Sequence, residues 1–254
     1  MTRIGLRLLT AVVVGALALA PPAQAYQVVT VSHGGALAGT VRFAGTPPRL
    51  EPLVVSKTRD VCGDQAEPER LVVGAERGVR GSVILLSGVT SGKKPGAELV
   101  LDNSRCVFVS HVSALMVGER VRVKNSDATL HNAHGFLGKP TVFNLALPNR
   151  DQMIDITRRL ISPGVIRVVC DAHPHMSAWV IVHDSPYYAV TDEHGGYRID
   201  GVPPGSYKLT MWHEGFRAKG HDKDGRPLYE EPRTVTKAIT VAPGATATVD
   251  FELK

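Results

Sequence analysis

Aromatic residues and cysteines are scarce in this chain of 254 residues: Phe, Trp and Tyr make up 6% of it, and only three residues are cysteine. Charged residues amount to 21% and hydrophobic residues to 43%, so the composition excludes general disorder. The net charge of +5 comes without a run of Lys and Arg, which argues against nucleic acid as a partner. After residue 25 the sequence has no further long apolar run, so we expect no membrane span there.

The first 25 residues have the three-part layout of a secretory signal peptide. Arg3 and Arg7 precede an apolar run at residues 8–20, and the small-x-small sequence AQA ends at Ala25. The run is shorter than the ~20 residues that a membrane span needs, which argues against an anchor. We therefore predict cleavage after Ala25 and a periplasmic or secreted protein, in a compartment where disulfides persist.

Short runs rich in Val, Ile and Thr recur between Gly- and Pro-rich turns, and several of them alternate apolar and polar residues, as at residues 121–124. No segment has the spacing of an amphipathic helix, so we expect an all-β chain of two or more sandwiches. Turn-rich stretches at 87–96 and 184–186 suggest the divisions. They give a signal peptide (1–25), an N-terminal β segment (26–92), a central domain (93–184) and a C-terminal domain (185–254).

The strongest chemical signal is the sequence CDAHPHM, from Cys170 to Met176, between two strand-like runs. A tight loop there would present a thiol, two imidazoles and a thioether. A trigonal site of two histidines and one cysteine, with a weak axial methionine, holds copper for electron transfer. Such a site needs one more histidine from elsewhere, and His131, at the end of the alternating run, is the candidate.

These residues resemble the cupredoxins, the small blue copper proteins, and above all their amicyanin-like branch. The resemblance spans roughly residues 98–182. It rests on the pattern G-x-x-V-x-V-x-N-x-D from Gly118, which leads into His131-Asn132, and on the C-x-x-H-x-x-M spacing. It implies a Greek-key β-sandwich with one mononuclear Cu(I)/Cu(II) site. The implied ligands are His131, Cys170, His173 and Met176, with Asn132 bracing the two ligand loops.

Two further expectations concern the second histidine ligand and the pairing of the other two cysteines. His175 is an alternative to His173, although the C-x-x-H spacing favours His173. If Cys170 is a ligand, Cys62 and Cys106 can pair in a disulfide, and all three cysteines are used. We also expect His173 to lie on an exposed loop, where its ring edge would be the exit for electrons.

Residues 187–254 resemble the carboxypeptidase regulatory-like domain, a small prealbumin-like β-sandwich. The pattern T-D-x-x-G-x-Y begins at Thr191, and P-P-G-x-Y begins at Pro203. This domain type implies no catalytic residues and, by its fold grouping, a contact with glycans. Residues 39–47 resemble its opening strand. The N-terminal segment is therefore either a sandwich of its own or part of a composite sandwich built from both ends of the chain.

The combination is similar to exported cupredoxin proteins of the methylamine-utilization type. We expect a protein that is not an enzyme and that transfers single electrons between periplasmic redox partners, such as a c-type cytochrome or a dehydrogenase. One alternative is a periplasmic copper carrier or storage protein with the same ligands. The other is a structural or carbohydrate-binding protein of the cell envelope, with the cupredoxin domain as scaffold.

Overall fold

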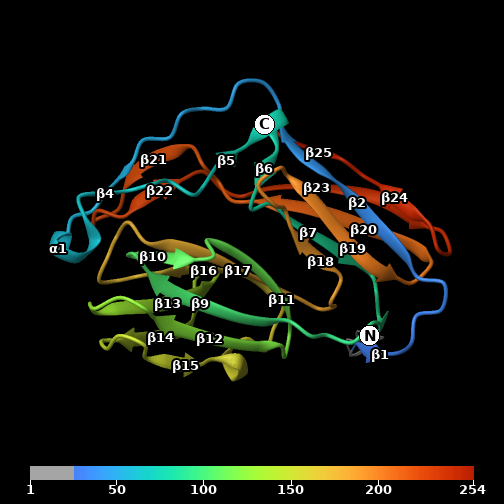
Figure 1. Ribbon diagram of the computed structural model, residues 1–254, viewed down its shortest axis with the longest axis horizontal. Helices are drawn as coiled ribbons and strands as arrows, with labels where there is room; N and C mark the ends of the chain where they lie inside the picture. The colour runs from blue at the N-terminus through green and yellow to red at the C-terminus, as the bar shows by residue number, and fades with distance from the viewer. Residues whose placement is uncertain (1–25) are drawn as a thin grey trace, which may run out of the picture.

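The computed structural model describes residues 26–254, so the predicted signal peptide lies outside the described residues. Almost all regular structure from Tyr26 onward is β, which confirms the expected all-β fold class. The strands form two β-sandwiches that lie against each other (Figure 1). Within residues 26–254, no helix has the length and apolar content that crossing a bilayer requires.

The first sandwich packs a sheet of four strands on a sheet of five. The smaller sheet has the order β10 (Val107–Val109), β9 (Glu98–Ser104), β12 (Arg120–Asn125), β15 (Met153–Asp155). The larger has the order β11 (Val112–Met116), β17 (Ser177–His183), β16 (Gly164–Val169), β13 (His131–Leu137), β14 (Thr141–Leu147). A 3-10 turn at Thr157–Arg159 follows β15. Alternate residues of both sheets fill the core between them, among them Leu101, Val123 and Val168.

The second sandwich is composite. Its four-stranded sheet has the order β18 (Tyr188–Val190), β7 (Val83–Ser87), β20 (Gly205–His213), β23 (Arg233–Val241). Its other sheet has the order β19 (Gly196–Val202), β2 (Gly35–Phe43), β24 (Thr246–Thr248), and β25 (Phe251–Leu253) also pairs with β2. Because β2 and β7 precede the first sandwich and their partners follow it, the first sandwich is an insertion within the second.

Four small strand pairs lie outside the two sandwiches. They are β1 (Gln27–Val28) with β8 (Ser91–Gly92), β3 (Leu53–Val54) with β4 (Gln65–Ala66), β5 (Val72–Val73) with β6 (Val79–Arg80) around a 3-10 turn at Ala75–Arg77, and β21 (Ala218–His221) with β22 (Pro227–Tyr229). Helix α1 (Arg59–Cys62) lies between β3 and β4, and we call residues 53–66 the cover hairpin. Figure 1 shows α1 and the β21–β22 hairpin at the same end of the molecule, over the first sandwich.

The two sandwiches share an apolar contact of their own. Val83 and Trp212 from the second sandwich pack with Ile181 from the first in a separate buried cluster. The rings of Trp179 and Trp212 meet edge to face, with their centroids 5.4 Å apart. Such aromatic pairs contribute about 1 kcal/mol beyond the area that they bury, so this contact fixes the sandwiches against each other.

Beside this cluster, one buried carboxylate joins three parts of the chain. Glu214, just after β20, accepts hydrogen bonds from Arg70 of the N-terminal segment, from His111 before β11, and from the indole nitrogen of Trp179 on β17. The Glu214 side chain is 2% exposed, so its charge depends on these partners. Burial acts to raise the pKa of Glu214, but the charge and hydrogen bond of His111 and the charge of Arg70 outweigh it, and the pKa is lowered.

The substitution Glu214→Gln should destabilise the folded chain by about 3 kcal/mol, because it leaves Arg70, whose side chain is only 11% exposed, without its counter-charge. The carboxylate stabilises the fold above its unfolded pKa of about 4.3, and this contribution is lost as pH falls through the lower folded pKa. Burial acts to lower the pKa of His111, and Glu214 outweighs it and raises the pKa. The His111 contribution is therefore complete below about pH 6.5 and lost as pH rises through the folded value.

The difference in unfolding free energy between the wild type and Glu214→Gln should therefore be largest between about pH 4.5 and 6.5. Urea denaturation at several pH values measures it. Glu231→Gln is the control, because Glu231 is exposed in the same segment. Equal losses for the two variants would contradict the structural role of the Glu214 carboxylate.

Candidate metal centre

Strand β13 brings His131 into the first sandwich. Burial alternates along β13, so His131, Ala133 and Gly135 face inward while Asn132 and His134 face outward. His131 is 0% exposed. His134 instead contacts Asp171 and Thr141 at the outer face of the sheet. The pleat of β13 therefore selects His131 over His134 for an inward site, as the sequence predicted.

The loop from Cys170 to Met176 connects the adjacent antiparallel strands β16 and β17. Its backbone closes on itself, because the Cys170 N–H donates to the Met176 carbonyl at 3.3 Å and the Met176 N–H donates to the His173 carbonyl at 3.0 Å. We call residues 170–176 the ligand loop. Strand β13 pairs with β16, so His131 lies next to this loop.

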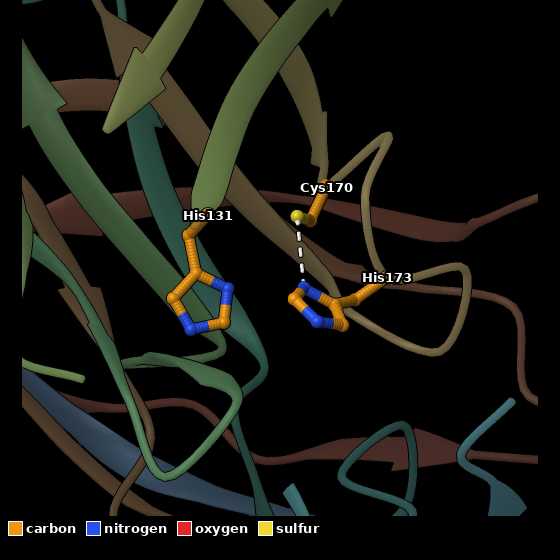
Figure 2. A group of neighbouring side chains, drawn as sticks. All are labelled: His131, Cys170 and His173. Carbon is orange, nitrogen blue, oxygen red and sulfur yellow. Dashed lines mark hydrogen bonds between the residues drawn. The ribbon is translucent and has the colours of Figure 1, made fainter. Parts of the chain in front are cut away.

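Three side-chain donors meet there (Figure 2). One ligand atom from each of His131, Cys170 and His173 lies within 4.8 Å of the other two, and all three residues are buried. The Cys170 sulfur is 3.6 Å from Nδ1 of His173. Met176 is 1% exposed and belongs to the same core cluster as Cys170. Three of the four residues predicted to form the site are thus gathered in one place, and Met176 is buried at the end of the same loop.

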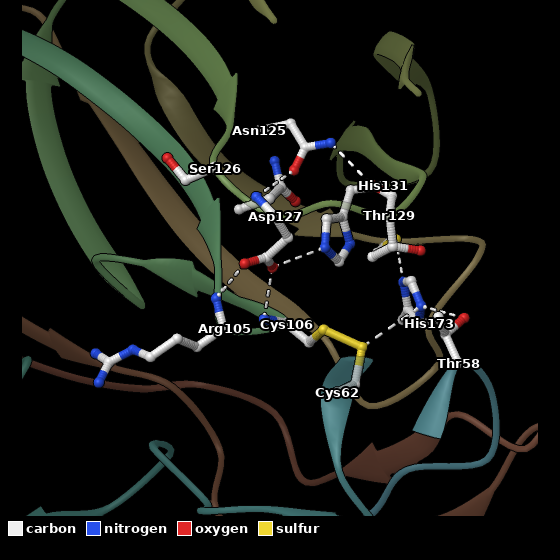
Figure 3. A network of polar contacts seen from close by, with 12 residues as sticks. Thr58, Cys62, Arg105, Cys106, Asn125, Ser126, Asp127, Thr129, His131 and His173 are labelled. Atoms are coloured by element: carbon white, nitrogen blue, oxygen red, sulfur yellow. Dashed lines mark hydrogen bonds and ion pairs between the residues drawn. A yellow bond between two sulfur atoms is a disulfide. The ribbon is translucent and has the colours of Figure 1, made fainter. Parts of the chain in front are cut away.

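His131 is held in an orientation that suits a ligand (Figure 3). Its Nε2 is 3.0 Å from the Asp127 carboxylate, which also accepts the backbone N–H groups of Arg105 and Cys106. With the proton on Nε2, the lone pair of Nδ1 is free, and this buried atom has no hydrogen-bond partner. An unpaired buried acceptor is costly, and a metal bound at Nδ1 would satisfy it. The His131 environment therefore fits a metal ion.

The electrostatics of the pocket keep both imidazoles neutral. Burial lowers the pKa of His131, against an opposing effect of Asp127. Burial, aided by His131 and His175, lowers the pKa of His173 to about 4. Burial also raises the pKa of the Cys170 thiol, partly offset by N–H groups that donate to the sulfur. Neutral imidazoles offer lone pairs to a metal, and the thiol would release its proton on binding one.

Asn132 and His175 lie outside the donor group, and each has hydrogen-bond partners of its own. The Asn132 N–H donates to the Cys170 sulfur at 3.3 Å, and its side-chain oxygen accepts the Asp171 N–H at 2.6 Å. Asn132 therefore links β13 to the ligand loop, as expected from the resemblance. Nε2 of His175 is 3.0 Å from the Cys106 carbonyl oxygen, and its Nδ1 is buried without a hydrogen-bond partner. The donor group contains His173 rather than His175.

The sequence-based expectation of an exposed His173 is wrong. His173 is 1% exposed, and its Nε2 lies 3.2 Å from the Thr58 hydroxyl and 3.9 Å from the Cys62 sulfur. Both contacts come from the cover hairpin, which a disulfide between Cys62 and Cys106 ties to the first sandwich (Figure 3). This is the pairing favoured by the cysteine count, and Cys170 is the free cysteine of the described chain.

Three contributors to the pocket were not assigned from the sequence. Asp127 ends the alternating strand pattern four residues before His131, and this spacing was the available signal for its contact with the ring. Thr58, beside His173, and Arg226, which donates to the Cys170 carbonyl, lie far from the ligand loop in sequence. Nothing in their local sequence marks them, because their contacts depend on how the two ends of the chain fold over the first sandwich.

Both resemblances noted from the sequence recur in comparisons with known proteins. Residues 169–254 match the carboxypeptidase regulatory-like domain. The match covers less than half of the chain. It begins at the ligand loop and includes β17, which pairs within the first sandwich, whereas β2 and β7 of the composite sandwich lie outside it.

Among solved structures, a Cu(I) form of an amicyanin variant has 21% identity and a TM-score of 0.30, covering 39% of this chain and 98% of its own. An oxidised amicyanin variant has 23% identity with the same coverage and score. The copper-containing nitrite reductase from Thermus scotoductus SA-01 has 19% identity and a TM-score of 0.30, with 39% and 25% coverage. A comparison with curated proteins gives no match. The assignment of a metal centre therefore depends on the donor group and its surroundings.

Replacing both bridged cysteines, Cys62→Ser with Cys106→Ser, should open the pocket. The disulfide closes a loop of 44 residues in sequence separation, which corresponds to about 4 kcal/mol of chain entropy. We expect the Cys170 thiol of the metal-free variant to react with Ellman's reagent at least about tenfold faster than that of the wild type, since local opening becomes easier.

This measurement is specific, because Cys170 is the sole free thiol of the wild type and the sole cysteine of the double variant. Adding Cys170→Ser to the double variant should abolish the reaction and serves as its control. An unchanged rate would show that the cover hairpin does not shield the pocket.

Proposed function

We propose that this protein binds one copper ion through His131, Cys170, His173 and Met176 and transfers single electrons between redox partners after export to the periplasm or the medium. A c-type cytochrome or a dehydrogenase is the kind of partner that we propose. The observation that carries the proposal is the buried group of one thiol and two imidazoles with donor atoms within 4.8 Å. This donor set, with a neighbouring thioether, favours copper over harder cations.

The bound ion would supply a one-electron Cu(I)/Cu(II) couple. The chain would supply a pocket that changes little between the two states. Asp127 holds the His131 ring, Asn132 ties the Cys170 sulfur to β13, and the β16–β17 ladder fixes both ends of the ligand loop. Each of these contacts lies within or beside a sheet, so the donors are held in place before a metal arrives.

A redox partner would approach this site over the cover hairpin. The outer nitrogen of His173 contacts Thr58 and Cys62 rather than solvent, so a partner docked there would meet α1 first. Val61 of α1 is 45% exposed, so this helix offers a docking surface directly above His173, which is 1% exposed.

A second candidate function is a copper carrier or storage protein with the same ligands. The burial of all three donors beneath a disulfide-tied hairpin favours it, because a carrier must shield its ion from solvent. The two functions differ in whether the site stabilises Cu(II) with a thiolate ligand or holds Cu(I) alone.

Adding Cu(II) to the purified mature protein should produce an intense thiolate-to-copper absorption band in the visible spectrum. We expect Cys170→Ser and His131→Ala to abolish the band, because each removes a donor of the group. His134→Ala is the matched control, since His134 lies on the same strand with its ring on the outer face, and it should keep the band.

The other outcomes separate the remaining functions. Tight, stoichiometric Cu(I) binding without a band would favour the carrier. The absence of stoichiometric binding of either copper ion would refute both copper proposals. A preference for Zn²⁺ with no affinity for copper would do the same, because zinc offers no redox couple.

Asp127→Asn should weaken copper binding by about 10–100-fold, because the amide no longer fixes the His131 ring as a carboxylate does. Competition with a copper chelator measures the affinity. Asp184→Asn is the control, since Asp184 is an exposed carboxylate 3.4 Å from His183 and outside the donor group. Equal affinities of the two variants would contradict the role assigned to Asp127.

A further inference from the structure

The ligand loop belongs to the first sandwich, yet its backbone is held by one side chain of the β21–β22 hairpin, which lies between β20 and β23 in sequence. Arg226, between β21 and β22, donates from Nη2 to the Cys170 carbonyl at 2.8 Å. Its Nη1 donates to the carbonyls of Pro174 at 3.1 Å and of Met176 at 3.2 Å. Three carbonyls of one seven-residue loop thus converge on a single guanidinium, and two of them belong to predicted ligands.

The loop needs this contact, because its own hydrogen bonds do not use all of its carbonyls. Within the loop, the Met176 carbonyl accepts from Cys170 and the His173 carbonyl accepts from Met176. The carbonyls of Cys170 and Pro174 take their hydrogen bonds from Arg226. Hydrogen bonds to a charged donor are stronger than those between neutral groups, and the planar guanidinium can serve several acceptors at once.

Arg226 is itself fixed in place. One Asp222 carboxylate oxygen accepts the backbone N–H groups of Asp224 and Arg226, each at 2.9 Å. The Asp222 N–H in turn donates to the Arg226 carbonyl at 2.9 Å. The turn between β21 and β22 is therefore closed by its own hydrogen bonds, and the Arg226 side chain is partly buried against the ligand loop.

The guanidinium also brings a permanent positive charge to the carbonyl of Cys170, the residue that would supply the thiolate. The other charges around Arg226 are the carboxylates of Asp171 and Asp222 and the guanidinium of Arg167. A positive charge at this place disfavours Cu(II) more than Cu(I), because its repulsion grows with the charge of the ion.

We propose that Arg226 is a positioning residue through which the β21–β22 hairpin sets the shape of the ligand loop and raises the reduction potential of the site. The inference about the potential rests on the proposed copper function, and the inference about the loop does not. The hairpin that carries Arg226 is thereby part of the metal centre, although it supplies no ligand.

Two variants separate charge from positioning. Arg226→Lys keeps the charge, but its single ammonium cannot span the three carbonyls. Arg226→Met removes both. Lys223→Met is the matched control, because it removes a positive charge from the same turn at an exposed position away from the loop. Thermal unfolding of all four proteins establishes that each one is folded, and Arg226→Lys keeps the test available should Arg226→Met fail to fold.

The first measurement uses the metal-free protein and does not depend on copper. We expect the Cys170 thiol to react with Ellman's reagent about tenfold faster in both Arg226 variants, because each variant loses charged hydrogen bonds to the carbonyls of the ligand loop. Lys223→Met should react at the wild-type rate. A wild-type rate in Arg226→Lys and Arg226→Met would overturn the positioning role, whatever the copper experiments give.

The second measurement is the reduction potential of the copper-loaded protein. Arg226→Met should favour Cu(II) over Cu(I) about tenfold relative to the wild type, a fall of about 59 mV for a one-electron couple. Arg226→Lys should fall by less, because the charge remains. Equal potentials for Arg226→Met and Lys223→Met would overturn the electrostatic role. Failure of the wild type to bind copper would refute the proposed function, while the thiol measurement would still decide the positioning role.

Discussion

The buried Glu214 carboxylate is the interaction on which the arrangement around the ligand loop depends. It ties Arg70, which follows the cover hairpin, to His111 and Trp179 of the first sandwich, and it immediately follows β20 of the second. Both segments that close over the ligand loop lie next to this network in sequence: the cover hairpin ends shortly before Arg70, and the β21–β22 hairpin begins shortly after Glu214. Because a buried charge that loses its partners is costly, the network fixes where the cover hairpin ends and where the β21–β22 hairpin begins.

The donor residues themselves could be predicted because their geometry is local. Cys170, His173 and Met176 lie in one short loop between paired strands, and the pleat of β13 decides that His131 faces inward. Spacing and alternation carry that information in the sequence. The choice of His173 over His175 followed from the same spacing, and in the structure His173 rather than His175 shares the donor group with His131 and Cys170.

The features that could not be predicted depend on contacts between distant parts of the chain. The exposed His173 expected from the loop alone is covered by Thr58 and Cys62, more than a hundred residues earlier. The N-terminal segment could not be placed from its sequence either, because the strands that pair with β2 and β7 follow the first sandwich in the sequence. The end of the chain adds two short strands to the same sheet, β24 and β25, which both pair with β2 in parallel.

Because one sandwich is inserted in the other, residues from outside the first sandwich can surround a site whose donors all belong to it. The donors come from the first sandwich, whereas Thr58 and Cys62 precede it in the chain and Arg226 follows it. A fragment limited to the first sandwich would keep the donors, but it would lose the contacts of Thr58 and Cys62 with His173 and the hydrogen bonds of Arg226 to the loop carbonyls. The composite second sandwich is thus more than an appended module: by joining the two chain ends, it brings both of these contacts to the same loop.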